Sequence, residues 1–177
     1  MYNSIELKKI LGGIMEKLKS QLVKLLTENA RYTYAQLAAM TASSEDAVIS
    51  AVKELETEGV IVKYAAILNT EALADKKVQA LIEVKVAPQK LKGFDSYAEQ
   101  LYNFNEVQSL YLMSGVFDLA VFVEGNHITD IAKFVSEKLS VIEGITSVQT
   151  HFILKRYKIE GQVTKQSGEN RRQLIQA

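Results

Sequence analysis

The stretch VQSLYLMSGVFDLAVFVEG (residues 107–125) decides the fold of this 177-residue chain. It holds two short runs rich in Val, Leu, Phe and Tyr, residues 107–113 and 116–123, joined at Ser114-Gly115. Such runs on either side of a Ser-Gly pair predict an antiparallel β-hairpin. Asp118 is unexpected in the second run, because aspartate is depleted from strands unless something holds its carboxylate. The hairpin therefore combines a tight turn with a nearby acid, and this turn could hold a small polar ligand.

The patterns around the hairpin predict the rest of a small sandwich. Residues 78–86 end in an alternation of apolar and charged side chains, which is typical of a half-buried strand. Helices are expected at residues 91–104 and 126–142, and a last strand at residues 146–157. The order strand, helix, strand, strand, helix, strand predicts a four-stranded antiparallel sheet with both helices on one face. This is the ferredoxin-like arrangement.

The face of the sheet that carries no helix is expected to be apolar. We place Val78, Tyr111, Val121 and Phe152 on this face. Exposed apolar patches larger than a few hundred Å² usually mark interfaces. A homodimer with its sheets packed face to face is therefore the simplest interpretation.

The N-terminal half is predicted to be helical. Apolar residues recur mostly every three or four positions over residues 5–26, but Gly12-Gly13 interrupts the pattern, and a glycine pair costs about 2 kcal/mol inside a helix. We therefore expect an arm at residues 1–14 and a first helix at residues 15–28. Thr33, with Gln36 at the capping-box position, is expected to begin a second helix.

A turn at Thr41-Ala42 leads to a third predicted helix, residues 44–58, which Ser43 caps and Gly59 ends. The last two helices are closely joined and predict a helix-turn-helix, followed at residues 60–68 by a strand or a bent wing hairpin. The fold class is thus α+β. Its expected parts are the arm (1–14), a winged helix-turn-helix domain (15–68), a linker (69–77), a ferredoxin-like domain (78–158) and a flexible tail (159–177).

Composition excludes several classes of function. The chain has 21 Lys plus Arg against 21 Asp plus Glu, so its overall field does not attract polyanions. It has no Cys and only two His, His127 and His151, which disfavours thiol chemistry and a catalytic or metal-binding His pair. No run approaches the roughly 18 apolar residues of a membrane span, and the first residues lack a signal pattern. We expect a cytoplasmic protein with no catalytic residues, cofactor or metal.

Two motifs in this order resemble the Lrp/AsnC (feast/famine) family of transcriptional regulators. The first runs through Leu37-Ala38, Val48, Leu55-Glu56 and Gly59-Val60-Ile61, and the second is Gly115-Val116-Phe117-Asp118. The resemblance covers roughly residues 15–157. It implies that the first domain binds double-stranded DNA and that the second forms homodimers, which assemble further into tetramers or octamers. It also implies that small effectors, usually amino acids, bind between dimers near the Gly-x-x-Asp turn.

The resemblance places effector contacts at Met113, Ser114, Gly115, Asp118 and Thr150. Backbone N–H groups at Ser114 and Gly115 could receive an α-carboxylate. Asp118 could pair with an α-ammonium, through a charge-assisted hydrogen bond worth about 1.5–3 kcal/mol. The alternative is that Gly115 only permits the turn and that Asp118 accepts local backbone N–H groups.

The candidate DNA contacts are Arg31, Ser43, Ser44, Ser50, Lys53 and Lys63, with Lys8, Lys9, Lys17 and Lys19 in support. The third helix is acidic, because residues 43–58 hold one base, Lys53, against five acids. Family members commonly carry Arg on this helix, around the positions of Ala51 and Lys53. Since phosphate binding depends on Lys and Arg, a ligand sensor or interaction module that keeps the helix-turn-helix without binding DNA is an alternative. A tetrapyrrole-processing enzyme of the same two-domain form is a third reading.

Overall fold

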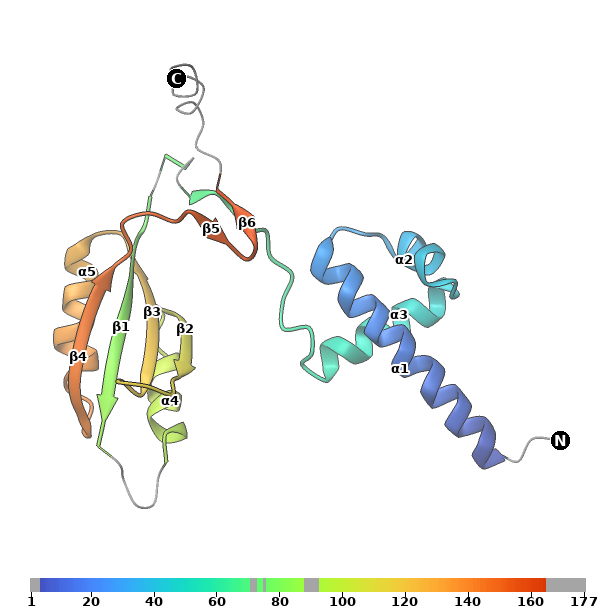
Figure 1. The fold of residues 1–177 in the computed structure, drawn as a ribbon, viewed down its shortest axis with the longest axis horizontal. Coiled ribbons are helices and arrows are strands. Elements are labelled where there is room, and N and C mark those ends of the chain that lie inside the picture. Colours follow the sequence, from blue (N-terminus) through green and yellow to red (C-terminus); the bar gives the residue numbers. More distant parts are fainter. Residues whose placement is uncertain (1–3, 71–72, 75, 88–92, 165–177) are drawn as a thin grey trace, which may run out of the picture. The chain divides into compact units, whose positions relative to one another are not determined.

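The structure is a computed structural model that describes residues 4–70, 73–74, 76–87 and 93–164. The chain divides into two compact units, Met1–Ala66 and Ile67–Ala177. The first unit is helical and the second is an antiparallel sheet with helices (Figure 1). This confirms the predicted α+β class. None of the described helices is long and apolar enough to cross a membrane.

Three helices form the first unit: α1 (Ser4–Glu28), α2 (Tyr34–Thr41) and α3 (Glu45–Thr57). Their apolar sides meet in one core. Its buried members are Leu18 and Leu22 of α1, Leu37 and Ala38 of α2, and Val48, Ala51, Val52 and Leu55 of α3. The apolar stripe predicted on α3 therefore holds the three helices together, and the opposite side of α3 faces solvent.

Helix α1 differs from the prediction, because it runs without a break from Ser4 through Gly12-Gly13 to Glu28. The break predicted at the glycine pair, and with it the helix start at residue 15, was wrong. Each Gly costs about 1 kcal/mol in a helix interior. A break would cost more, because the segment before it would need a helix nucleus of its own. The helix therefore continues through the pair.

The N-terminal caps of α2 and α3 follow from local sequence. Thr33 Oγ1 accepts from Gln36 N–H at 3.2 Å, and Gln36 Oε1 accepts from Thr33 N–H at 2.9 Å, so the predicted capping box is confirmed. The cap of α3 was predicted one residue too early. Ser44, not Ser43, is its N-cap, and Ser44 Oγ accepts from Ala47 N–H at 3.3 Å.

The segment after α3 is not the expected strand or wing hairpin. Gly59, at φ +72°, ends α3 as predicted, but residues 60–68, all of them described, form no strand. A β-ribbon needs a second extended segment to satisfy its backbone groups, and residues from Ile67 onward already belong to the second unit. Ile61 instead packs on the helical core, and Tyr64 donates its hydroxyl hydrogen to Glu56 Oε1 at 2.9 Å.

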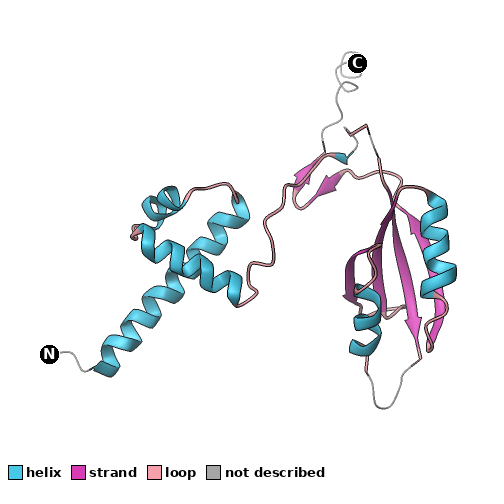
Figure 2. Ribbon diagram, turned by 180° about the vertical axis from the view of Figure 1, so that it is seen from behind, coloured by secondary structure: helices cyan, strands magenta, loops and turns pink. Residues whose placement is uncertain are grey.

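The second unit has the predicted order of main elements. They are β1 (Val78–Val86), α4 (Asp95–Tyr102), β2 (Val107–Leu112), β3 (Leu119–Gly125), α5 (Ile128–Lys133), the π-helical turn η2 (Phe134–Leu139) and β4 (Ile145–Phe152). The strands pair antiparallel in the order β2-β3-β1-β4. The helices cover one face of the sheet (Figure 2). The ferredoxin-like arrangement is therefore confirmed.

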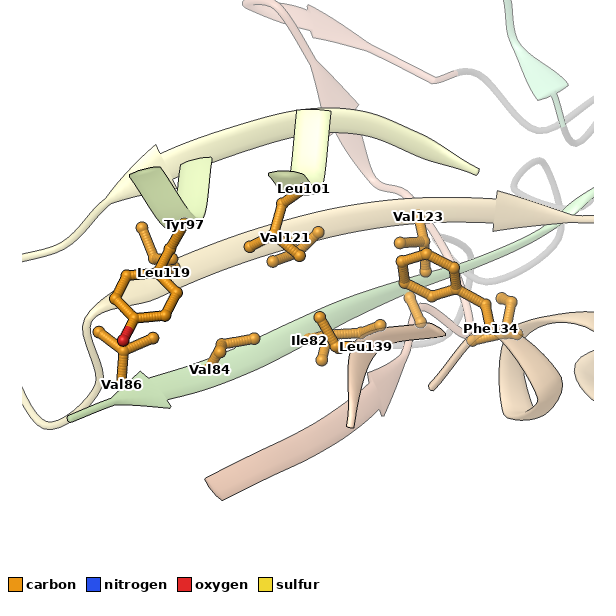
Figure 3. Close-up of a cluster of buried hydrophobic side chains, with 12 residues drawn as sticks. Ile82, Val84, Val86, Tyr97, Leu101, Leu119, Val121, Val123, Phe134 and Leu139 are labelled. Carbon is orange, nitrogen blue, oxygen red and sulfur yellow. The ribbon is translucent and has the colours of Figure 1, made fainter. Parts of the chain in front are cut away.

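Alternation along β1 and β3 decides which side chains the helices cover. Ile82 and Val121 face each other across the two strands, are 0% exposed, and pack in one cluster with Phe134 of η2 (Figure 3). The neighbouring register pair, Leu81 and Phe122, points to the other side of the sheet. The sheet thus has a helix-covered face and an open face.

Three of the four residues predicted on the open face lie on the helix-covered face instead. Val121 is buried in the core, Val78 packs against that core, and Phe152 pairs with the buried Ala80. Tyr111, 54% exposed, is on the open face as predicted. An error of one residue in the register of a strand moves all its side chains to the other face.

The hairpin between β2 and β3 has a wider connection than predicted. β3 begins at Leu119, three residues later than expected, so Asp118 lies in the connection of residues 113–118 and not in a strand. The difficulty of an aspartate inside a strand therefore disappears.

Other boundaries also differ from the predictions. α4 begins at Asp95, and residues 88–92 of the expected strand end and helix lie outside the described residues. β4 ends at Phe152, five residues before the expected end. The predicted tail begins in a short hairpin, β5 (Lys158–Ile159) with β6 (Gln162–Val163), while its residues 165–177 lie outside the described residues.

Replacing Gly144 by Ala should destabilise the second unit by about 3 kcal/mol or more. Gly144 has φ +92°, and a Cβ there would lie 2.9 Å from Tyr97 Cζ and overlap the Tyr97 hydroxyl. Chemical denaturation measures the loss. Gly115→Ala is the control, because a Cβ at Gly115 meets no atom within 4 Å; equal stability of the two variants would contradict the prediction.

Candidate functional site

The residues predicted to contact DNA have exposed or half-exposed side chains in four places: Arg31 before α2, Ser43 and Ser44 at the start of α3, Ser50 and Lys53 on its outer side, and Lys63 after it. Ile49, 40% exposed, is also on the outer side of α3. A hydroxyl, an ammonium and a branched apolar group together suit contacts to phosphates, base edges and thymine methyls in a major groove. The sequence analysis did not single out Ile49.

Two of the acids of the third helix are neutralised from within the unit. Lys19 of α1 lies 2.8 Å from Glu58 Oε1 and 2.9 Å from Glu54 Oε2, and its side chain is only 10% exposed. Hydrogen bonds to Glu58 and Glu54 raise the pKa of Lys19 well above its usual value. Lys19 is therefore a structural cation of the helix-turn-helix. It is not available to contact DNA, so the supporting DNA contact predicted for it was wrong.

A third acid, Glu56, is also engaged. Burial and the hydrogen bond to Glu56 raise the pKa of Tyr64 to about 12. The acids left without such partners among the described residues are Glu45 and Asp46, in the first turn of α3, where a negative charge stabilises the helix dipole. The outer side of α3 is therefore less acidic than its sequence indicates.

The predicted effector turn is the connection between β2 and β3. Met113 N–H donates to Asp118 O at 2.8 Å and closes it. The side chains between these residues are mostly exposed, Val116 at 82%. The backbone N–H groups of Ser114 and Gly115 donate to no other residue in the described part of the chain. The turn thus presents two adjacent backbone donors, as binding a carboxylate would require.

Asp118 is held by the end of β1. Its N–H donates to Val84 O at 3.0 Å, and its Oδ2 accepts from Val86 N–H at 2.9 Å. These bonds extend the β1–β3 ladder beyond its last register pair, Val84 with Leu119. The carboxylate therefore has a structural role, but its donor, Val86, is 32 residues away along the chain and not a local N–H group as the alternative supposed. Oδ1 makes no hydrogen bond to any described residue and remains for a ligand cation.

Gly115 has no structural need to be glycine within one chain. Its φ is outside the left-handed region, and a Cβ would meet no atom within 4 Å. The alternative in which Gly115 only permits the turn is therefore disfavoured. A side chain at this position would instead obstruct whatever approaches the turn from outside.

Thr150 is not beside this turn within one chain. It pairs with Ile82, whereas Asp118 bonds to Val84 and Val86, further along β1. β1 also separates β4 from β3. The structure thus groups Met113, Ser114, Gly115 and Asp118 and leaves Thr150 apart from them. Over the described residues, no group of three or more His, Asp or Glu is arranged to hold a metal ion.

Comparisons with known proteins agree with this architecture. The family described as winged helix-turn-helix DNA-binding matches residues 15–62, and the Lrp/AsnC ligand binding domain matches residues 79–163. YugG, an uncharacterized HTH-type transcriptional regulator of Bacillus subtilis, is 39% identical over 158 residues, covering 89% of this chain and 95% of that protein. The HTH-type transcriptional regulator LrpA of Pyrococcus abyssi is 33% identical over 137 residues, covering 77% and 94%.

Solved structures share the fold. A transcriptional regulator of Neisseria meningitidis, crystallised as a complex with L-Met, is 27% identical, with a TM-score of 0.63 over 81% of this chain and 92% of that chain. The leucine response regulatory protein of Mycobacterium tuberculosis has a TM-score of 0.69 at 23% identity, covering 84% and 98%. The latter likeness concerns the fold alone.

Two substitutions separate the structural role of Asp118 from its charge. Asp118→Ala removes the acceptor for Val86 N–H and should destabilise the second unit by about 1–2 kcal/mol. Asp118→Asn keeps an oxygen acceptor, so its stability should stay within about 0.5 kcal/mol of the wild type. Urea denaturation of both variants measures this difference. Equal losses in the two variants would show that the hydrogen bond is not what Asp118 contributes.

Proposed function

The chain belongs to the Lrp/AsnC family of HTH-type transcriptional regulators, and from this we propose that it binds double-stranded DNA through α3 and an amino-acid-like effector at residues 113–118. Effector binding would change how dimers assemble, and so the spacing of the helices presented to DNA. The membership gives the class of function, transcription regulation. The residues in each role are part of the proposal.

The outer side of α3 supports the DNA part. Ser50 and Lys53 are exposed beside Ile49, while Lys19, Glu54 and Glu58 form an ion-pair group on the side of α3 that faces α1. Lys53 would contact a phosphate, and Ile49 would contact a thymine methyl. Ser44 adds a hydroxyl at the positive end of the helix, where anions bind favourably.

The space at Gly115 is the observation that carries the effector part. Nothing in the described part of the chain explains a glycine there, and two backbone donors lie at the same point. An α-carboxylate on these donors would bring the α-ammonium toward Asp118 Oδ1. The L-Met complex of the Neisseria regulator makes an amino acid the ligand class to test first.

The open face of the sheet supports assembly into homodimers. Leu81, Tyr111, Phe122 and Ile153 supply its apolar groups, while Glu83 and His151 form a pair at 3.3 Å beside them. Covering these groups with a second copy would remove apolar surface from water. Thr150 pairs with the buried Ile82 and therefore lies on the helix-covered face, not on this open face. We propose further assembly to tetramers or octamers from the family alone.

A sensor that does not bind DNA is the second candidate. Glu45 and Asp46 favour it, because they place two negative charges in the first turn of α3, where the helix would approach phosphates. No such obstacle exists for the effector turn. The two candidates differ only in whether α3 contacts DNA.

DNA binding is tested by changing single charges on α3. Lys53→Gln should weaken binding and reduce the slope of log K against log salt by about 0.9, the value for one phosphate contact. Glu45→Gln with Asp46→Asn should tighten binding. Fluorescence anisotropy with DNA from upstream of the protein's own gene measures both, and Lys133→Gln in α5 is the control. Absence of binding at every salt concentration would reject the DNA-binding function and favour the second candidate, a sensor that does not bind DNA.

Effector binding is tested by thermal shift of the full chain with each of the twenty amino acids. A ligand at about 100 times its Kd stabilises the folded state by about 2.7 kcal/mol. Gly115→Val should abolish the shift without changing the unliganded Tm, because a Cβ at this position meets no atom within 4 Å. Lys133→Gln should keep the shift. A shift that persists in Gly115→Val would show that the effector does not bind at the turn.

A further inference from the structure

A pocket lies at the end of the sheet opposite to the effector turn. The turn joins the start of β3 and the end of β1, whereas this pocket lies where β1 begins and β3 ends. Its volume is about 210 Å³, and the polar residues that line it are Thr70, Lys77, Gln79, Glu124, Lys155 and Arg156. None of the residues proposed above for DNA or effector contacts lines this pocket.

The one acid among these residues is already satisfied. Glu124 Oε1 lies 3.2 Å from Lys77 Nζ, and Glu124 Oε2 accepts from Gln79 Nε2 at 2.7 Å. Partial burial acts to raise the pKa of Glu124, but the hydrogen bonds from Gln79 and Lys77 and the charge of Arg156 lower it below its usual value. Glu124 is therefore an ionised residue of the pocket lining whose two carboxylate oxygens both have partners. Its negative charge balances the positive charge of Lys77.

Two cations remain. Lys155 and Arg156 form no ion pair with any described residue, although both line the pocket. Lys155 Nζ lies 5.0 Å from the centre of the Tyr157 ring, a cation–π contact that positions the ammonium without neutralising it. The pocket therefore has a net positive charge.

The backbone that carries these cations is fixed at both ends. Ile153 N–H donates to Gln79 O at 2.8 Å, just beyond the end of β4. Thr164, next to β6, donates its hydroxyl hydrogen to Arg156 O and its N–H to Tyr157 O at 3.1 Å. This gives the β5–β6 hairpin a role, because it holds the cationic segment. Groups positioned before binding lose less entropy on binding.

We propose that this pocket binds a small oxyanion, the carboxylate or phosphate group of a molecule that fits about 210 Å³. The Arg156 guanidinium can donate two parallel hydrogen bonds to either group, and Lys155 adds a second charge. The volume is many times the roughly 10–15 Å³ that one water molecule needs, which suits inorganic phosphate or a short dicarboxylate.

Isothermal titration of the full chain, in a buffer free of both anions, tests the proposal with inorganic phosphate and with succinate. We expect saturable binding at one site per chain. Arg156→Gln and Lys155→Gln should each weaken it at least tenfold, and Lys133→Gln should not. Saturation by phosphate alone assigns a phosphate group, saturation by succinate alone assigns a carboxylate, and saturation by both assigns the shared oxyanion chemistry.

Two measurements keep the outcome unambiguous. The Tm of Arg156→Gln without anion should stay close to that of the wild type, because among the described residues Arg156 forms no ion pair and loses only its electrostatic attraction to Glu124. If this Tm falls, the binding and Tm of Lys155→Gln decide the outcome. Gly115→Val should bind the anion normally. Absence of saturable binding, equal binding by the wild type and both pocket variants, or loss of binding in Gly115→Val would each overturn the proposal.

Discussion

Burial of one side of β1 and β3 under α4, α5 and η2 is the constraint on which the second unit depends. Ile82 and Val121 must point to the helices, so Leu81 and Phe122 must point away from them. The same register places the turn of residues 113–118 at one end of the sheet and the cationic pocket at the other. The packing of the helices on one side of the sheet thus positions an open face and two separate polar sites.

Both units use ionic or polar side chains in positions where the sequence suggests another role. Asp118 is the acid expected for a ligand, yet one of its oxygens completes the hydrogen bonding of β1. Lys19 is a base expected for DNA, yet it neutralises Glu54 and Glu58. A carboxylate has two oxygens and several lone pairs, so a structural bond on Oδ2 leaves Oδ1 for a ligand. The ammonium of Lys19, by contrast, is buried between two carboxylates and is not available to a further ligand.

The parts of the fold that were predicted correctly depend on short segments. The capping box of Thr33 and Gln36, the apolar stripe of α3, the stop at Gly59 and the order of strands and helices all follow from residues a few positions apart. The incorrect predictions concern structures whose relative stability is not decided by adjacent residues in the sequence. Continuation of α1 through its glycine pair and the late start of β3 each depend on a balance between competing local structures.

The sequence by itself determined the main helices and strands, their order and the family, because caps, turns and periodicity are set by nearby residues. Only the tertiary structure decided the face of Val121, the partners of Lys19, the separation of Thr150 from the turn, and the meeting of Lys77, Glu124 and Arg156. These contacts join residues tens of positions apart. They form when whole segments pack, and packing selects a register that no short stretch of the chain encodes.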